Sequence, residues 1–181
     1  MRVITGTARG RKLGQLQGMD TRPTTDQVKE SIFNIIQFDI EGRRVLDLFA
    51  GTGQLGIEAL SRGAAGCTFV DQRRDAAALV RSNLKLCRLS DRARVVQGEA
   101  LSFLASDRER YHLVFLDPPY QTELLENALK KIAEIDILME NGIIICESPA
   151  DKVLPELPQP YRKGREYRYG KIKVTVYRKE V

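Results

Sequence analysis

The sequence predicts an α/β fold with a mostly parallel, seven-stranded sheet, helices on both faces and a terminal antiparallel hairpin. Three observations support this prediction. From residue 44 onward, short apolar runs alternate with segments of helical periodicity, which is the pattern of successive βαβ units. A glycine-rich loop joins the first apolar run to the helix that follows it. Residues 166–177 alternate in polarity around Gly170, as a hairpin does.

The elements can be placed along the chain from the same patterns. We expect the five leading strands at residues 45–49, 67–70, 93–96, 113–116 and 142–146, and two more in the hairpin at 166–177. We expect helices at residues 55–62, 76–89, 100–104 and 124–135, the first of them ended by Gly63. Parallel strands buried on both faces read as short continuous apolar runs, as these do.

A small basic extension precedes this pattern. Two strand-like pieces around Val3 and Leu13 flank a cationic cluster, which predicts a β-hairpin arm. A helix follows, with Thr24 or Thr25 as its cap and apolar residues at helical spacing after it. We therefore expect two parts: residues 1–40, a basic hairpin arm and helix, and residues 41–181, the domain that carries the sheet.

The composition excludes several classes of protein. The chain has 181 residues, of which 43% are hydrophobic and 29% charged, as in an ordinary globular domain. Cys67, Cys87 and Cys146 are odd in number and widely spaced, so we expect buried free thiols rather than disulfides or a metal site. His112 is the only histidine, which disfavours a Ser-His-Asp triad and a multi-histidine metal centre. With neither a leader nor a long apolar run, we expect a soluble, cytoplasmic protein.

Positive charge is concentrated at the two ends of the chain. Residues 1–30 hold six basic and three acidic side chains, residues 31–160 hold 15 and 19, and residues 161–181 hold eight and two. Binding to a phosphate backbone rewards such clusters through counterion release. Tyr161, Tyr167 and Tyr169 are interleaved with the last cluster and could stack on bases. A nucleic-acid partner is therefore favoured, with two solvated basic tails as the alternative.

The glycine loop indicates a nucleotide-like ligand. Gly51, Gly53 and Gly56 form a G-x-G-x-x-G pattern between a strand and a helix. Asp47 would repel the pyrophosphate of a dinucleotide, whereas it would attract the ammonium and sulfonium of S-adenosylmethionine. Asp71, after the second strand, can accept both ribose hydroxyls of either ligand, or else cap the next helix. Glu99, after the third strand, can reach an adenine amino group or stabilise a helix start.

A polar tetrapeptide, Asp117-Pro118-Pro119-Tyr120, follows the fourth strand at the same edge of the sheet. Two prolines remove N–H donors and stiffen the chain, which leaves carbonyls pointing outward. An exocyclic amine is a poor nucleophile because its lone pair is delocalised into the ring. The Asp117 carboxylate and the Pro118 carbonyl could accept its two hydrogens while Tyr120 stacks on the extruded base. The alternative is a proline-rich turn that only ends a strand.

These motifs resemble those of the class I S-adenosylmethionine-dependent methyltransferases, which have a Rossmann-like fold, and within them the RsmD family of 16S ribosomal RNA guanine-N2 methyltransferases. The resemblance spans nearly the whole chain. The residues that carry it are MRVI at 1–4 with GRKL at 10–13, RPT at 22–24 with ESIFN at 30–34, residues 47–63 including EALSRG at 58–63, the tetrapeptide at 117–120, and YGK at 169–171.

The resemblance implies an enzyme of the 16S rRNA (guanine(966)-N2) type. It would transfer a methyl group from S-adenosylmethionine, release S-adenosylhomocysteine, and act as a monomer on 16S rRNA within an assembled small subunit, with no metal and no membrane. Residues 41–181 would be the methyltransferase domain. The guanine would be held by Asp117, Pro118 and Tyr120. The cofactor would be held by Asp47, Phe49, Gly51, Gly53, Asp71, Glu99, Ala100 and Asp117. RNA phosphates would be bound by Arg2, Arg9, Arg11, Lys12 and Arg22, although Arg22 could instead have a structural role.

Three other functions remain open from the residues alone. The tetrapeptide also suits a methyltransferase that acts on adenine N6 in DNA or RNA, or on a protein glutamine, because each target is a planar nitrogen. A non-catalytic RNA-binding module would keep the fold without the reaction. An NAD-dependent oxidoreductase would share the glycine pattern, but the chain leaves no room for a separate substrate domain.

Overall fold

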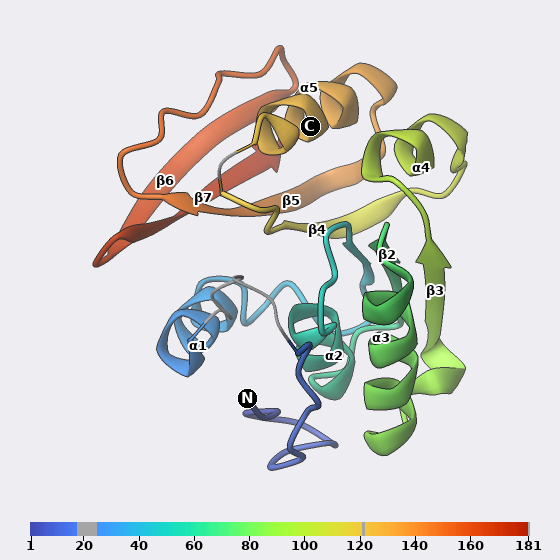
Figure 1. Ribbon diagram of the computed structural model, residues 1–181. Helices are drawn as coiled ribbons and strands as arrows, with labels where there is room; N and C mark the ends of the chain where they lie inside the picture. Colours follow the sequence, from blue (N-terminus) through green and yellow to red (C-terminus); the bar gives the residue numbers. More distant parts are fainter. Residues whose placement is uncertain (18–24, 121, 181) are drawn as a thin grey trace.

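The computed structural model describes residues 1–17, 25–120 and 122–180. These residues form a seven-stranded sheet in the order β3-β2-β1-β4-β5-β7-β6 (Figure 1). The strands are β1 (Arg44–Asp47), β2 (Gly66–Asp71), β3 (Ala93–Gln97), β4 (Tyr111–Leu116), β5 (Leu138–Pro149), β6 (Tyr161–Tyr169) and β7 (Ile172–Lys179). The helices are α1 (Asp26–Ile35), α2 (Gln54–Ser61), α3 (Arg74–Leu86), α4 (Ala100–Ser106) and α5 (Leu124–Ile135), with a 3₁₀ turn η1 (Ser90–Arg92).

The strand order reverses direction at the middle of the sheet. The first five strands are mutually parallel, while β7 pairs antiparallel with both β5 and β6. From β1 the chain moves outward to β2 and β3, and then returns to place β4 on the other side of β1. Ligands of open α/β sheets bind at such a reversal point, beyond the carboxyl ends of the strands. The topology therefore directs attention to the segments that follow β1 and β4.

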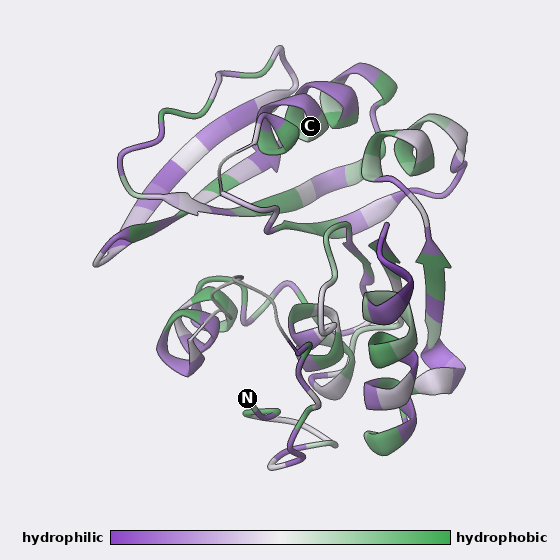
Figure 2. Cartoon of the chain, viewed as in Figure 1, coloured by the Kyte–Doolittle hydropathy of each residue, from purple (hydrophilic) through white to green (hydrophobic). Residues whose placement is uncertain are grey.

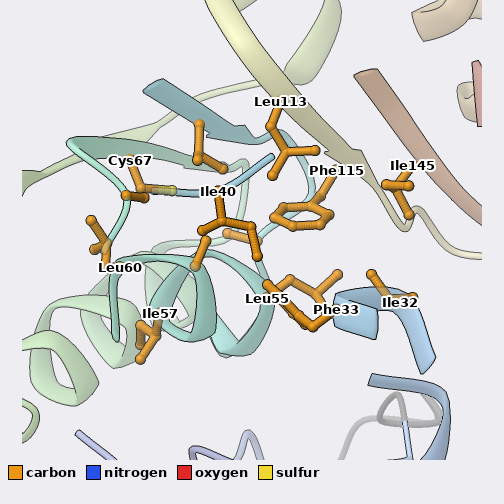
Figure 3. Packing of buried hydrophobic residues seen from close by; sticks show 14 of the residues in the cluster. Ile32, Phe33, Ile40, Leu55, Ile57, Leu60, Cys67, Leu113, Phe115 and Ile145 are labelled. Carbon is orange, nitrogen blue, oxygen red and sulfur yellow. The ribbon is translucent and has the colours of Figure 1, made fainter. Parts of the chain in front are cut away.

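Helices cover both faces of the sheet, as predicted. In Figure 1, α1, α2 and α3 lie on one side of the strands, and α4 and α5 lie on the other. Two hydrophobic clusters fill the spaces between helices and sheet. Figure 3 shows the first of them, where Phe33 of α1 meets Phe115 of β4 with their ring centroids 5.7 Å apart. Alternate residues of β1 and β4 enter opposite clusters, because side chains alternate across a strand.

Some element boundaries differ from the predicted ones, and each difference has a physical reason. The helix expected to reach residue 89 ends at Leu86, because Arg88 takes a positive φ of 57°. The strands β5 and β6 extend beyond the apolar segments that predicted them. Figure 2 shows β6 with few hydrophobic residues; it is the edge strand of the sheet, and much of it is exposed. Such a strand has no apolar run by which the sequence could reveal its full length.

The N-terminal arm is less regular than a β-hairpin. The two predicted pieces pair through an antiparallel bridge between Arg2 and Lys12 and through backbone hydrogen bonds on either side of it, but they do not form regular strands. The arm is also held by α2, where the Glu58 carboxylate accepts the backbone N–H groups of Ile4 at 2.8 Å and Thr5 at 3.0 Å. Side chains of the arm also enter the hydrophobic cluster that α1 and α2 share with the sheet.

The prediction of buried free thiols agrees with the structure. All three cysteines are buried free thiols. Within the described residues, no group of three or more acidic, histidine or cysteine side chains could hold a metal ion. None of the helices in residues 1–17, 25–120 and 122–180 has the length and apolar character needed to span a bilayer.

Candidate active site

The carboxyl ends of five parallel strands meet at one edge of the sheet, and each is followed by a residue with a candidate role. Two backbone hydrogen bonds tie the segment after β1 to its neighbours: Leu48 N–H donates to the Phe115 carbonyl of β4 at 3.2 Å, and Ala50 N–H donates to the Val70 carbonyl of β2 at 2.9 Å. The glycine loop and the tetrapeptide, 61 or more residues apart in sequence, therefore start side by side.

The glycine loop takes a shape that only glycine adopts without strain. Gly51 and Gly53 have positive φ values of 57° and 83°, and Gly53 is the N-cap residue of α2. At Gly56 a Cβ atom would lie 2.3 Å from the Phe69 ring, so glycine is also required for α2 to pack against β2. A Cβ at Gly51 would meet no atom of the described residues within 4 Å, which leaves that side of the loop accessible to a ligand.

Asp47 is buried beneath this loop. Its carboxylate is 2% exposed and accepts the Gly56 N–H at 3.1 Å. Burial raises the pKa of Asp47 to about 7, with a smaller contribution from the neighbouring negative charge of Asp71, while the hydrogen bond from Gly56 opposes the rise. Phe49, two residues further on, is half-buried. Asp47 therefore supports the loop from below and is charged in only part of the population near neutral pH.

Asp71 connects three of the strand ends. One of its oxygens accepts the Gly51 N–H and the other accepts the Arg73 N–H, both at 2.9 Å, while its carbonyl accepts the Gly98 N–H at 3.0 Å. The residue is half-buried. Asp71 is not the N-cap of the next helix, since the N-cap residue of α3 is Arg73.

Glu99 is the N-cap of α4, so the structural role considered for this residue is present. Its carboxylate accepts the N–H groups of Leu101 at 3.0 Å and Ser102 at 2.8 Å, and the Ser102 hydroxyl. Partial burial raises its pKa, but these hydrogen bonds outweigh burial and hold the pKa of Glu99 below its usual value. Glu99 lies after β3, which is paired with β2, and the buried Ala100 follows it. The cap fixes the carboxylate at the edge where the ligand is expected.

The tetrapeptide leaves β4 beside this edge. Asp117 and Tyr120 are half-buried, Pro118 is buried and Pro119 is exposed. The Tyr120 hydroxyl donates to a carboxylate oxygen of Glu147 at 2.9 Å. Glu147 lies near the end of β5 and was not selected from the sequence. It follows a run of apolar strand residues directly, as Asp71 and Asp117 do, and that signal would have identified it.

The proposed RNA contacts are placed only in part. Arg2, Arg9, Arg11 and Lys12 are all exposed on the N-terminal arm, whereas Arg22 lies outside the described residues. The idea that three tyrosines near the carboxyl end stack on bases is wrong for Tyr161, which is 3% exposed and donates its hydroxyl to Asp136 at 2.6 Å. Tyr167 and Tyr169 are half-buried and pack against the hydrophobic cluster under α1 and α2.

Two polar residues that the sequence did not single out join the arm to the site. Asn83 of α3 is 2% exposed; its side-chain amide donates to the Thr52 carbonyl in the glycine loop at 2.9 Å and exchanges hydrogen bonds with Gly14 of the arm. Glu58 binds the other end of the arm, as described above. By contrast, His112 lies near the amino end of β4, where its Nδ1 accepts the Arg44 N–H at 3.0 Å, away from the candidate site.

The comparisons with known proteins agree with this geometry. Residues 1–178 match the model of a family described as conserved hypothetical protein 95. The protein YlbH of Bacillus subtilis is 46% identical over 182 residues, covering 99% of both chains. The ribosomal RNA small subunit methyltransferase D of Escherichia coli strain K12 is 37% identical over 180 residues, covering 99% of this chain and 90% of its own.

Solved structures give the same assignment. The structure of yhhF from Escherichia coli superposes with a TM-score of 0.90 at 38% identity and covers 99% of this chain and 98% of its own. Fold, sequence and the arrangement of the carboxyl edge agree with one another, and the fold is the Rossmann-like fold of the class I methyltransferases. The chain belongs to the RsmD family of ribosomal RNA small subunit methyltransferases.

Proposed function

We propose that the protein transfers a methyl group from S-adenosylmethionine to the exocyclic N2 of a guanine in the 16S rRNA of the small ribosomal subunit. One observation carries the proposal: the tetrapeptide Asp117–Tyr120 and the glycine loop leave neighbouring parallel strands at the reversal point of the sheet. A loop that can hold a nucleoside and a motif that can hold a planar amine thus lie side by side, as transfer between the two requires.

The residues at the carboxyl edge fit S-adenosylmethionine. The space beside Gly51 is free of protein atoms among the described residues, so the backbone of the loop can be approached closely. Asp71 would accept the ribose hydroxyls, Glu99 would face the adenine amino group, and Phe49 and Ala100 would supply apolar contact. Asp47, buried below, favours a cationic ligand when it is ionised. The cofactor, when bound, supplies a methyl group activated by the positive sulfur.

The tetrapeptide would prepare the amine for attack. The Asp117 carboxylate and the Pro118 carbonyl accept the two amine hydrogens, which turns the nitrogen lone pair out of the ring system toward the methyl group. Tyr120 stacks on the base once it has left the RNA helix. As the N–C bond formed, the bond between the methyl carbon and the sulfonium sulfur would break and S-adenosylhomocysteine would leave, while Asp117 would accept the proton that the nitrogen loses. Positioning and electrostatics then account for the catalysis, without a covalent enzyme intermediate.

The basic arm would supply the RNA contacts. Arg2, Arg9, Arg11, Lys12 and Arg22 would bind backbone phosphates, which fix the position of the RNA but do not read its sequence. The target would be the guanine at position 966, presented by an assembled subunit, and one copy of the chain would be sufficient. The E. coli relative that carries the name ribosomal RNA small subunit methyltransferase D supports a small-subunit substrate.

A transfer assay with tritium-labelled S-adenosylmethionine tests the proposal. Small subunits from a strain without the modification, naked 16S rRNA and duplex DNA are compared as acceptors, with the Asp117→Ala variant as the control for background. We expect label in subunits, and none above background in DNA. Label found only in DNA would contradict the proposal and favour an adenine N6 enzyme, while label found in none of the acceptors would exclude all of the methyltransferase functions considered for these nucleic acids.

A further inference from the structure

A buried carboxylate faces the base-binding tyrosine from the neighbouring strand. Cys146 of β5 is the register partner of Leu116 of β4, so Glu147 continues β5 beside Asp117. Glu147 is 3% exposed, and its Oε1 accepts the Tyr120 hydroxyl at 2.9 Å. The contact joins two residues 27 positions apart and crosses from a strand to the loop that precedes α5. Glu147 thus contacts a residue that the proposed function assigns to the base.

Glu147 occupies a position among apolar strand residues. It follows the apolar run Ile143 to Cys146, and its register partner in β7 is Val174. Burying a carboxylate costs free energy unless hydrogen bonds compensate, and an apolar residue of similar size would avoid that cost. Hydrogen bonds to an ionised acceptor are shorter and stronger than neutral ones. A carboxylate at this position is therefore better explained by what it holds than by packing.

The two partners differ in how firmly the fold holds them. β5 is paired on both sides, with β4 and with β7, so the backbone of Glu147 is fixed within the sheet. Tyr120 lies between β4 and α5, in neither a strand nor a helix. A site carried by a loop is less precise than one carried by a strand unless a supporting side chain fixes it. Glu147 supplies such support at the hydroxyl end of the ring.

We propose that Glu147 is a positioning residue that holds the Tyr120 ring at the angle at which it stacks on the extruded guanine. The inference rests on the proposed function and deepens it, because it identifies what orders the base-binding residue. Glu147 acts through Tyr120, so its removal lowers transfer to RNA without weakening cofactor binding. Removing the Tyr120 hydroxyl or the Glu147 carboxylate then breaks the same hydrogen bond.

A double-mutant cycle in the full chain tests this. The variants are Glu147→Ala, Tyr120→Phe and the two combined, with small subunits as acceptor and S-adenosylhomocysteine affinity measured by calorimetry. We expect each single substitution to lower kcat/KM for the subunit about tenfold, and the double variant to match the worse single rather than multiply the two losses. The dissociation constant of S-adenosylhomocysteine should change by less than about twofold, whereas a general loss of structure would raise it.

Conservative and matched variants complete the design. Glu147→Gln keeps an acceptor oxygen and should recover kcat/KM to within about threefold of wild type. If Glu147→Ala does not fold, Glu147→Leu, which fills a similar space but offers no acceptor oxygen, takes its place in the cycle. Tyr161→Phe removes the hydroxyl of another buried tyrosine that donates to a carboxylate, the exposed Asp136, at the opposite edge of the sheet, and should leave kcat/KM unchanged.

The outcomes separate this inference from the proposed function. If the wild-type chain methylates subunits but Glu147→Ala keeps full kcat/KM, or if the double variant shows the product of the two single losses, Glu147 does not act through Tyr120 and the inference is wrong. The proposed function survives either result. If the wild-type chain methylates no RNA, the proposed function itself fails, independently of any Glu147 variant.

Discussion

Asp47 shows how one residue can serve the fold and the ligand in different charge states. It lies beneath the glycine loop, accepts the Gly56 N–H and is 2% exposed. Burial raises its pKa to about 7 from an ordinary value of 3.8. The protonated form is the easier one to bury, whereas the ionised form is the one that attracts a cationic ligand. Burying the ionised form of Asp47 therefore lowers the free energy of unfolding, as is common for groups at functional sites.

The pH dependence of stability should report this pKa. Between pH 4 and 7 the folded chain keeps a proton on Asp47 that the unfolded chain has released, so the contribution of Asp47 to the free energy of unfolding falls as the pH rises through this range. Asp47→Asn cannot ionise, and its amide oxygen can still accept the Gly56 N–H. In urea unfolding, the free energy of unfolding of Asp47→Asn relative to that of wild type should rise by about 2 kcal/mol from pH 5 to pH 8. If the free energies of unfolding of the variant and of wild type differ by the same amount at both pH values, the pKa of Asp47 is not raised.

Substitutions of Asp71 and Asp117 should affect cofactor binding and methyl transfer separately. Asp117→Ala removes the proposed acceptor of the amine, so kcat should fall by about 10²-fold or more, with a much smaller change in cofactor affinity. Asp71→Ala removes the proposed charged acceptor of the ribose and releases Gly51, so the cofactor dissociation constant should rise by about 10- to 100-fold. Calorimetry with S-adenosylhomocysteine and single-turnover transfer measure the two effects. Full turnover in Asp117→Ala would refute the role of the tetrapeptide.

At the scale of elements, α2 connects the glycine loop to the N-terminal arm. Its first turn begins at Gly53, and its last turns carry Glu58 and Ser61, which bind the arm backbone. Glu58 and Lys29 of α1 are both 0% exposed, with the Lys29 Nζ 3.6 Å from a Glu58 oxygen and bound to the Arg2 carbonyl at 2.6 Å. Burial lowers the pKa of Lys29, although the negative charge of Glu58 opposes the change. Arm, α1 and α2 are thus held together by one buried polar network.

Removing Glu58 should release the arm. Glu58→Ala leaves the buried Lys29 without its counter-ion and removes the acceptor of the Ile4 and Thr5 N–H groups, so the free energy of unfolding should fall by about 3–5 kcal/mol. Glu134→Ala, which breaks only the surface pair with Lys131 on α5, should cost less than about 1 kcal/mol. Urea unfolding of both variants measures the difference. A loss at Glu58 no larger than that at Glu134 would show that the network does not hold the arm.

Elements were predictable from sequence where burial on both faces leaves a clear apolar pattern. The helix at residues 124–135 was predicted with the bounds that α5 has, and β1 to β4 were each recognised. The arm and β6 were predicted less well, because hydrogen bonds to distant residues, rather than local pattern, decide their form. The same limit applies to the site: motif residues were identified, whereas Glu58 and Asn83 act through contacts that only the folded chain creates.

At the scale of the whole molecule, charge is divided between an acidic centre and two basic ends. The arm carries Arg2, Arg9, Arg11 and Lys12 exposed on the side of the sheet that α1, α2 and α3 cover (Figure 1). The basic carboxyl-terminal segment forms the β6–β7 hairpin at one edge of the sheet. A net charge of +5 therefore understates the local field that an RNA would meet.

The salt dependence of RNA binding should show whether the arm contacts phosphates. Replacing Arg9, Arg11 and Lys12 with glutamine should weaken binding and reduce the slope of log K against log salt by about 2. Replacing Arg108, Lys130 and Lys131, which lie in or near α4 and α5 on the other face, makes the same change in net charge and should leave the slope nearly unchanged. An identical slope in wild type and the arm variant would mean that these three residues do not touch phosphate.

The identity of the methylated nucleoside tests the central claim most directly. Subunits from a strain lacking the enzyme are incubated with the purified chain and S-adenosylmethionine, and their 16S rRNA is digested to nucleosides for mass spectrometry against standards. The account predicts one new product, N2-methylguanosine, which is absent with Asp117→Ala. A product that is N6-methyladenosine, or a guanosine methylated at another position, would contradict it.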